Sequence, residues 1–407
     1  MSDQRLNKYA RLLIELGVNV KKDQYLIIEA PVDAYQLVQA CTKIAFEKQA
    51  KDVVVFYTDA YVDKQRCLNV DPKLIETVLP WQKESRVTYL KENACSLLIK
   101  SAYPYLYSDV NSEASSALQK FTNDLRNNIR QYIASDNIQW CIASYPNPLW
   151  AQTLFPDDDK QVALDKMFDV IYQMCRVNYQ DDPLENWHKH LTDMTKYGQK
   201  LDEFKLDRLH FTNALGTDLW IGLHPNARFS KSASEEVKFV ANIPTEEISS
   251  CPDKYRVNGI VYASKPLEIG GAIIEDFYFK FKDGKVIEHF AKKNKALLDN
   301  LLDTDEGSRY LGEVALVEYK TPISQSKLLF YNTLYDENAS CHLALGKGFP
   351  SCIEGCSNTD LADWQKYNLN FSTIHIDFMF GTSDMKIVGY DAKGLAYDIF
   401  IDGNFAF

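Results

Sequence analysis

The first 180 residues alternate short apolar runs with longer amphipathic segments, and this alternation limits the possible fold more than any other feature. Near-continuous hydrophobicity is typical of strands that are covered on both faces. The apolar runs cover residues 25–28, 53–57, 95–99 and 139–142. Between them, apolar residues recur at helical spacing over 34–45 and 114–129. Strands that alternate with helices indicate crossover connections, so we predict an α/β N-terminal domain with a mostly parallel sheet over residues 1–180.

This domain lacks the glycine-rich sequences that hold nucleotide phosphates. Open parallel sheets often bind nucleotides at the ends of their strands. However, neither G-x-G-x-x-G nor G-x-x-x-x-G-K-[ST] follows any of the four apolar runs. A nucleotide-dependent enzyme would therefore rest on fold analogy alone, and we predict that the domain shapes the substrate site instead.

The pattern changes after residue 180. Asp182 is a suitable N-cap for a helix that begins at Pro183. Beyond this helix we expect three hairpin turns and one further helix. The turns lie at 214–216, 283–284 and 402–403, and the helix covers 291–302. These hairpins predict an antiparallel-rich α+β C-terminal domain over residues 181–407, which we expect to be the catalytic domain.

The charge balance excludes several classes of partner. The 56 acidic residues outnumber the 45 Lys and Arg residues, which gives a net charge of −11. Such a surface repels phosphate backbones and anionic membranes. No apolar stretch approaches the roughly 18 residues that a membrane-spanning helix needs. We therefore expect neither a nucleic-acid nor a membrane partner.

Cysteine usage is typical of an intracellular protein. The nine cysteines are an odd number and lack the close spacing of a disulfide framework. Cys352 and Cys356 could form a redox or metal pair, but no second pair stands nearby. Free thiols fit a reducing compartment, and the polar first residues lack the apolar segment of a signal peptide. We expect a cytoplasmic protein.

The segment over residues 373–379 contains the most informative polar pair. Its alternating pattern predicts a strand with His375 and Asp377 on one face and apolar residues on the other. Burying both polar groups is costly unless each has a partner. A divalent metal would supply that partner, whereas a hydrogen-bonded core pair and a wet face are the alternatives.

Three further segments supply candidate ligands. An acidic, loop-like segment over 333–342 ends in His342, although an exposed acidic turn would look the same. A strand-like segment over 239–243 stops before Glu246 and Glu247, and Glu313 begins an apolar strand. Mixed imidazole and carboxylate ligands suit zinc, cobalt or manganese. So many carboxylates also suit two metal ions, because one can bridge while the others stay terminal.

At these residues the chain resembles the thermophilic-type metalloaminopeptidase family. The resemblance runs over nearly the whole chain and is densest in 242–247, 305–317, 332–342 and 375–379. It implies an enzyme that releases N-terminal amino acids from peptides with two divalent ions, and a homodimer. The metal ligands that it implies are Glu247, Glu313, Glu337, His342, His375 and Asp377. It also implies that Glu313 acts as the catalytic acid/base. Glu246, which precedes Glu247 in the sequence, is an alternative base.

One residue departs from the family pattern. Where the family typically has a tyrosine before a proline, this chain has Phe349 before Pro350. The tyrosine hydroxyl is expected close to the metals, and the loss of one such donor costs about 10²–10³ in turnover. The alternative reading is therefore a metal-containing, peptide-binding protein with weak or no activity.

Overall fold

The four apolar runs form one parallel sheet in the computed structural model, which describes residues 3–134, 138–229, 239–269, 272–357 and 360–407. The strand order is β2-β1-β3-β4, and every neighbouring pair is parallel, as predicted. The strands are β1 (Tyr25–Pro31), β2 (Asp52–Thr58), β3 (Cys95–Lys100) and β4 (Trp140–Ser144). This sheet belongs to a compact unit made of residues 1–188 and 233–244.

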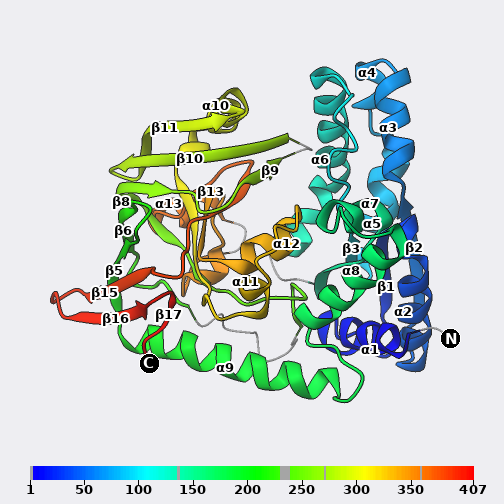
Figure 1. Ribbon diagram of the computed structural model, residues 1–407, viewed down its shortest axis with the longest axis horizontal. Coiled ribbons are helices and arrows are strands. Elements are labelled where there is room, and N and C mark those ends of the chain that lie inside the picture. The colour runs from blue at the N-terminus through cyan, green and yellow to red at the C-terminus, as the bar shows by residue number, and fades with distance from the viewer. Residues whose placement is uncertain (1–2, 135–137, 230–238, 270–271, 358–359) are drawn as a thin grey trace. The chain divides into compact units, whose positions relative to one another are not determined.

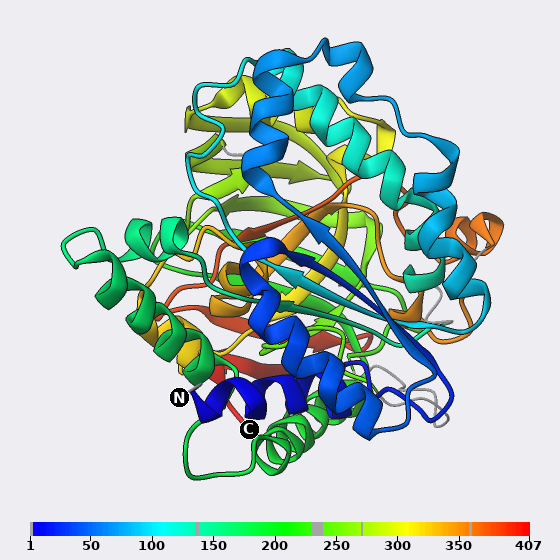
Figure 2. The same cartoon turned by 90° about the vertical axis from the view of Figure 1, so that its right-hand side faces the viewer.

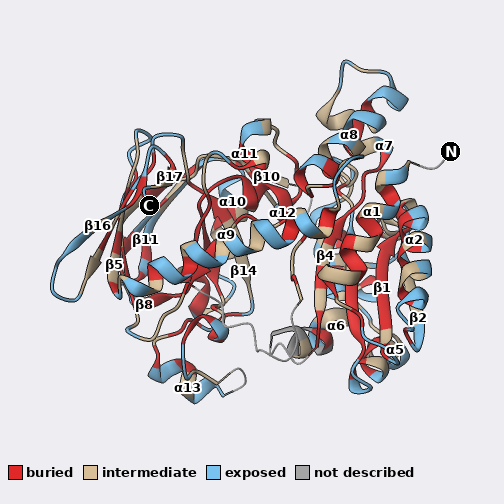
Figure 3. Ribbon diagram, turned by 90° about the horizontal axis from the view of Figure 1, so that it is seen from below, coloured by how far each residue is buried: buried red, intermediate tan, exposed pale blue. Residues whose placement is uncertain are grey.

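Helices connect and cover these strands (Figure 2). Helix α2 packs on β1 and β2, and α5 packs on β1. All but the first residue of β1 is buried, which explains its near-continuous hydrophobicity (Figure 3). The helices are α1 (Gln4–Leu12), α2 (Tyr35–Glu47), α3 (Ala60–Asn69), α4 (Pro72–Ile75), α5 (Pro80–Lys91), α6 (Ser112–Ala134), α7 (Pro148–Leu154) and α8 (Lys160–Met174).

Helix α9 (Pro183–Glu203) begins in the first unit and ends in the second, which comprises residues 189–232 and 245–407. Asp182 accepts a hydrogen bond from the Leu184 N–H (2.9 Å), which is the expected N-cap contact. The predicted division between residues 180 and 181 falls just before this helix, and the two-domain assignment stays a prediction.

The second unit contains a nine-stranded antiparallel sheet (Figure 1). Its order is β11-β10-β8-β6-β5-β15-β16-β17, and β9 pairs with β10. The three predicted hairpins join β5 to β6, β10 to β11 and β16 to β17. The strands are β5 (Leu206–Thr212), β6 (Asp218–Leu223), β8 (Pro252–Tyr262), β9 (Leu267–Ile269), β10 (Ala272–Lys282), β11 (Lys285–Lys293), β15 (Lys386–Asp391), β16 (Ala396–Ile401) and β17 (Asn404–Phe405).

A smaller antiparallel sheet in the same unit has the order β14-β13-β12-β7. Its strands are β7 (Ile248–Ser250), β12 (Leu311–Leu316), β13 (His342–Gly346) and β14 (His375–Met379). One face of this sheet carries Val314, Leu343, Leu345 and Phe378, which join the apolar core beneath the larger sheet. Because side chains alternate along a strand, this core leaves the opposite face of the small sheet available for polar groups.

Three local predictions were wrong. The helix expected over 291–302 begins only at Lys295, because β11 continues to Lys293 and Asn294 adopts a left-handed conformation (φ 57°). The loop-like segment over 333–342 is instead largely helical, with α12 (Thr333–Asp336) followed by a 3₁₀ turn (Glu337–Ala339). The segment over 239–243 contributes only a single bridge to β4.

The remaining helices are short: α10 (Lys295–Leu302), α11 (Pro322–Ser326) and α13 (Leu361–Lys366). Within the described residues, none of the helices combines the length and the hydropathy that crossing a lipid bilayer would require.

Two turn glycines provide a matched test of how tightly the second unit is packed. Gly284 (φ +83°) and Gly394 (φ +85°) have almost the same conformation, but a Cβ on Gly284 would lie 1.8 Å from the Lys254 carbonyl oxygen, whereas one on Gly394 meets nothing within 4 Å. We expect Gly394→Ala to lower the free energy of unfolding by about 1–2 kcal/mol. Gly284→Ala should lower the free energy of unfolding by about 1–3 kcal/mol more than Gly394→Ala does, because β8 and the turn between β10 and β11 must move apart. Urea unfolding measures both, and equal shifts would contradict this packing.

Candidate metal centre

The face of the small sheet that points away from the core collects the polar residues predicted from sequence. Across the strands, Glu313 pairs with Ala344, and Ala344 pairs with Asp377. His342 lies two residues before Ala344, and His375 lies two residues before Asp377, so both histidines project to the same face as this row of paired residues. Residues that pair across antiparallel strands project to one face, so the register brings together side chains that are up to 64 positions apart.

The ligand atoms form two groups that share one carboxylate. His342 Nε2 lies 3.0 Å from Glu247 Oε2, and His375 Nε2 lies 3.2 Å from Glu313 Oε2 and 3.3 Å from Asp377 Oδ1. Within the group Glu247, Glu313 and His342, the ligand atoms are within 4.8 Å of one another, and the same holds for Glu313, His375 and Asp377. Glu313 belongs to both groups, which is the arrangement expected of a bridging ligand.

Backbone carbonyls orient both imidazoles. His342 Nδ1–H donates to the Ser340 carbonyl (3.1 Å), and His375 Nδ1–H donates to the Lys347 carbonyl (2.7 Å). These bonds place the ring proton on Nδ1 and leave Nε2 as the ligand atom in each case. Such outer contacts are typical of imidazoles that bind metals.

The site concentrates negative charge where water is largely excluded. Glu313 is 4% exposed and His342 is 1% exposed. Burial lowers the pKa of His342, but its hydrogen bond with Glu247 and the charges of Asp377 and Glu313 outweigh burial and raise the pKa to about 10. Burial is likewise outweighed at His375, where Asp377 and Glu313 raise the pKa well above its usual value. The three carboxylates and two imidazoles form a donor set that fits divalent metals.

Two other predicted residues lie outside both ligand groups. Glu337 is in the 3₁₀ turn that follows α12, and among the described residues neither group includes it or Glu246. Glu246 is buried; its N–H donates to Asn338 Oδ1 (2.7 Å), and its Oε2 lies 3.6 Å from His190 Nε2 on α9. Their roles stay predictions.

Sequence reasoning missed Ala344, which is fully buried between Glu313 and Asp377 in the register. A larger side chain at this position would project between the two carboxylates, because residues paired across antiparallel strands share a face. No sequence pattern marks this alanine, because only the pairing of the three strands reveals its neighbours.

Phe349 lies directly beside His375, one of the candidate metal ligands. Its ring centroid is 4.8 Å from that of His375. Its backbone is held by Cys251, whose Sγ accepts the Phe349 N–H (3.1 Å) and donates to the Phe349 carbonyl (3.3 Å). The residue that departs from the family pattern is therefore part of the metal centre's wall.

Asp305 fixes the chain that leads into β14. One carboxylate oxygen accepts hydrogen bonds from the Thr373 N–H (2.7 Å) and the Thr373 hydroxyl (2.6 Å), and the other accepts one from the Ser372 hydroxyl (2.8 Å). Partial burial opposes ionisation, but these bonds and one from Ser308 lower the pKa of Asp305 to about 2. Asp305 thus holds the chain at Thr373, two residues before β14 begins at His375.

Known proteins match this chain over nearly its whole length. The family model described as thermophilic metalloprotease (M29) matches residues 2–405. Aminopeptidase AmpS of Bacillus subtilis (strain 168) is 39% identical and is covered over 99% of both chains; aminopeptidase PepS of Streptococcus thermophilus is 33% identical over 98% of both. Wild-type AmpT from Thermus thermophilus superposes with a TM-score of 0.92, at 29% identity over 99% of both chains. This structural match confirms the predicted fold class.

A more distant structure shares the fold alone. The 2,5-dihydroxypyridine dioxygenase from Pseudomonas putida KT2440 has a TM-score of 0.51 at 11% identity, with 99% of this chain and 97% of that chain covered.

Ala344 allows a direct test of the space between the carboxylates. We expect Ala344→Leu to remove most bound metal while the fold persists, because the added carbons would lie between Glu313 and Asp377, at an overpacking cost of about 1–3 kcal/mol. Ala344→Ser adds one atom and is the control. Metal per chain, measured by mass spectrometry after chelation and reloading, reports the effect, and circular dichroism checks the fold. Full metal content in Ala344→Leu would show that the ions bind elsewhere.

The hydrogen bonds of Asp305 predict a pH-dependent contribution to stability. Its folded pKa of about 2 lies below the ordinary value of 3.8, so its contribution is complete above about pH 4 and is lost as the pH falls towards 2. We expect Asp305→Asn to be less stable than wild type at pH 7, with a smaller difference at pH 3. Urea unfolding at both values measures it. A difference that does not change with pH would mean that ionisation of Asp305 is irrelevant.

Proposed function

The chain belongs to the thermophilic metalloprotease (M29) family, as its sequence resemblance predicted, and from this membership we propose that it is a dinuclear aminopeptidase that releases N-terminal amino acids from peptides. The single observation that carries the proposal is the pair of ligand groups that share Glu313. A shared carboxylate between two sets of terminal ligands suits two neighbouring ions.

The ligand types leave three candidate metals. Imidazole nitrogens together with carboxylate oxygens suit zinc, cobalt or manganese, and cellular supply decides among metals of similar preference. We propose two ions of this class, held by Glu247 and His342 on one side and by His375 and Asp377 on the other, with Glu313 between them.

The protein's own side chains have separate roles in the proposed reaction. Bound divalent ions would supply an activated water and a polarised carbonyl. His342 and His375 are held with Nε2 towards the carboxylates by their carbonyl partners, so the ligand set is preorganised before metal arrives. Glu313, or buried Glu246, takes the proton of the attacking water and passes it to the leaving nitrogen.

The assembly and compartment follow from weaker arguments and are part of the proposal. The family resemblance favours a homodimer that acts on peptides, and the first 180 residues are proposed to shape the substrate site. The nine cysteines are free, and eight of them are buried, which fits a reducing cytoplasm.

Removing a ligand tests the proposal. We expect His375→Ala to lower kcat/KM for leucine p-nitroanilide by at least about 100-fold, since even outer-shell changes at metal sites cost 10–100-fold. His210→Ala is the matched control, because His210 also pairs with a carboxylate (Asp218, 2.7 Å) but lies on the larger sheet. Exhaustive chelation should abolish wild-type activity, and added zinc, cobalt or manganese should restore it.

An N-acetylated substrate completes this experiment, because an aminopeptidase requires a free amine. Wild-type turnover that persists in His375→Ala after chelation would disprove the metal assignment. Equal cleavage of the acetylated substrate would disprove exopeptidase action.

A further inference from the structure

One buried side chain joins two of the segments that carry metal ligands. We propose that this residue, Asn338, is a positioning residue for one of the two metal ions, the ion of the first ligand group. The inference rests on the proposed dinuclear function and deepens it. The first ligand group consists of Glu247, Glu313 and His342, and the second consists of Glu313, His375 and Asp377.

Both ends of the Asn338 amide form hydrogen bonds. The residue is fully buried and lies in the 3₁₀ turn between α12 and β13. Its Oδ1 accepts the N–H of Glu246 (2.7 Å), and its Nδ2 donates to the carbonyl of Leu334 (2.8 Å). An amide suits this pair of contacts, because one partner is a donor and the other is an acceptor. Asn338 therefore ties the residue before Glu247 to the helix that leads towards His342.

The backbone is held on both sides of Glu247. On one side, Ile248 begins β7, which pairs with β12, and its side chain is buried in the core of the unit. On the other side, the N–H of Glu246 is bound by Asn338. Between these two fixed points the Glu247 carboxylate reaches His342 Nε2 at 3.0 Å. Ligands that are held in this way by the surrounding structure are preorganised for the ion.

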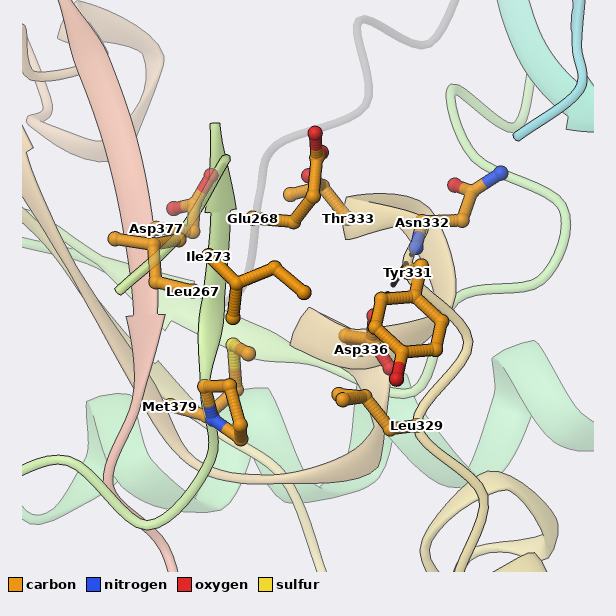
Figure 4. Close-up of a pocket in the computed structure, with 11 residues that line it drawn as sticks. Leu267, Glu268, Ile273, Leu329, Tyr331, Asn332, Thr333, Asp336, Asp377 and Met379 are labelled. Atoms are coloured by element: carbon orange, nitrogen blue, oxygen red, sulfur yellow. Dashed lines mark hydrogen bonds between the residues drawn. The ribbon is translucent and has the colours of Figure 1, made fainter. Parts of the chain in front are cut away.

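The turn that carries Asn338 is itself well anchored. The Asp336 carboxylate accepts hydrogen bonds from the N–H groups of Phe330 (2.8 Å) and Asn332 (3.1 Å). The Asn332 side chain in turn accepts the N–H of Leu334 (3.2 Å) at the start of α12. Figure 4 shows Asn332 and Asp336 on the opposite side of a small pocket from Asp377. These contacts fix the turn from which Asn338 reaches the Glu246 backbone.

The second ligand group depends on a different contact. Asp305 holds the chain at Thr373, just before β14 and its two ligands. The two partners of the Asn338 side chain lie instead in the segments that lead to Glu247 and His342. Loss of the Asn338 amide should therefore weaken the ion of the first group and spare the ion of the second.

The test measures metal binding by the full-length protein. The chelated protein is titrated with Co²⁺, and calorimetry gives the number of ions bound and the dissociation constant of each. We expect the wild type to bind two ions. Asn338→Ala should bind one ion as the wild type does, whereas the dissociation constant of the other should rise about tenfold or more, because residues that hold metal ligands contribute about 10–100-fold to affinity.

Two ligand variants show which ion is affected. His375→Ala removes a ligand of the second group only, and His342→Ala removes a ligand of the first group only. Asn338→Ala should weaken the remaining ion by about tenfold or more in the His375→Ala background and should have no effect in the His342→Ala background, since such a cycle isolates the coupling between two residues. Equal effects in both backgrounds, or the reverse pattern, would overturn the proposal.

Asn147 offers a matched control in the first unit. It is almost completely buried, its Oδ1 accepts the N–H of Trp150 (2.9 Å), and its Nδ2 donates to the carbonyl of Ala102 (2.7 Å). Asn147→Ala therefore loses the same types of hydrogen bond as Asn338→Ala, but it should leave both dissociation constants unchanged. An equal loss of metal affinity in Asn147→Ala would reduce the effect of Asn338→Ala to general destabilisation.

Two smaller changes separate the two hydrogen bonds of Asn338 and replace Asn338→Ala should that variant fail to fold. A serine hydroxyl can bond the carbonyl four residues earlier, so Asn338→Ser should keep the contact with Leu334 and lose the one with Glu246. Asn338→Asp keeps an oxygen for the Glu246 N–H and loses the donor to Leu334. We expect Asn338→Ser to weaken the ion of the first group more than Asn338→Asp does, and the opposite order would overturn the proposal.

The positioning role and the proposed function fail in distinguishable ways. A wild type that binds two ions, with both dissociation constants unchanged in every Asn338 variant, would overturn the positioning role and leave the dinuclear assignment intact. A wild type that binds fewer than two ions would instead contradict the proposed function.

Discussion

The accumulation of carboxylates on one face of a four-stranded sheet is the constraint on which the site depends. Three carboxylates and two imidazoles converge there, and Glu313 and His342 are almost completely buried. Carboxylates in such surroundings repel one another unless cations intervene. Divalent ions bound by these groups would supply the compensating positive charge. The rest of the unit must therefore hold the three carboxylates together against their mutual repulsion.

Burial of the opposite face stabilises the arrangement. Val314, Leu343, Leu345 and Phe378 anchor three strands in one apolar core, and that burial offsets the cost of gathering the charged groups. The polar face is then adjusted locally. Carbonyl groups orient the imidazoles, and Asp305 holds the chain at Thr373, just before β14. Stability and function therefore come from two faces of the same strands.

The sequence predicted the local features of the fold, and it did not predict the features that depend on the pairing of strands. The alternation around His375 and Asp377 correctly predicted a strand with both on one face, and the four apolar runs correctly predicted the parallel sheet. The approach of Glu247 to His342 and the place of Ala344 follow from strand register, which no local pattern encodes. The helix of residues 333–336 was misjudged because its four residues are too few to show a helical period.

Phe349 is packed against His375, one of the candidate metal ligands. Its ring lies against His375, while its backbone is fixed by Cys251, so the position where the family typically has a tyrosine hydroxyl is occupied by an aromatic edge without a donor. The two candidate groups consist of Glu247, Glu313, His342, His375 and Asp377, and a phenylalanine ring offers no oxygen, nitrogen or sulfur atom to either. A tyrosine hydroxyl at this position could bind a metal ion or stabilise the oxyanion, and the Phe349 side chain can do neither. A metal-containing, peptide-binding protein would need the same two ligand groups, so turnover and not metal content separates that alternative from the proposed peptidase.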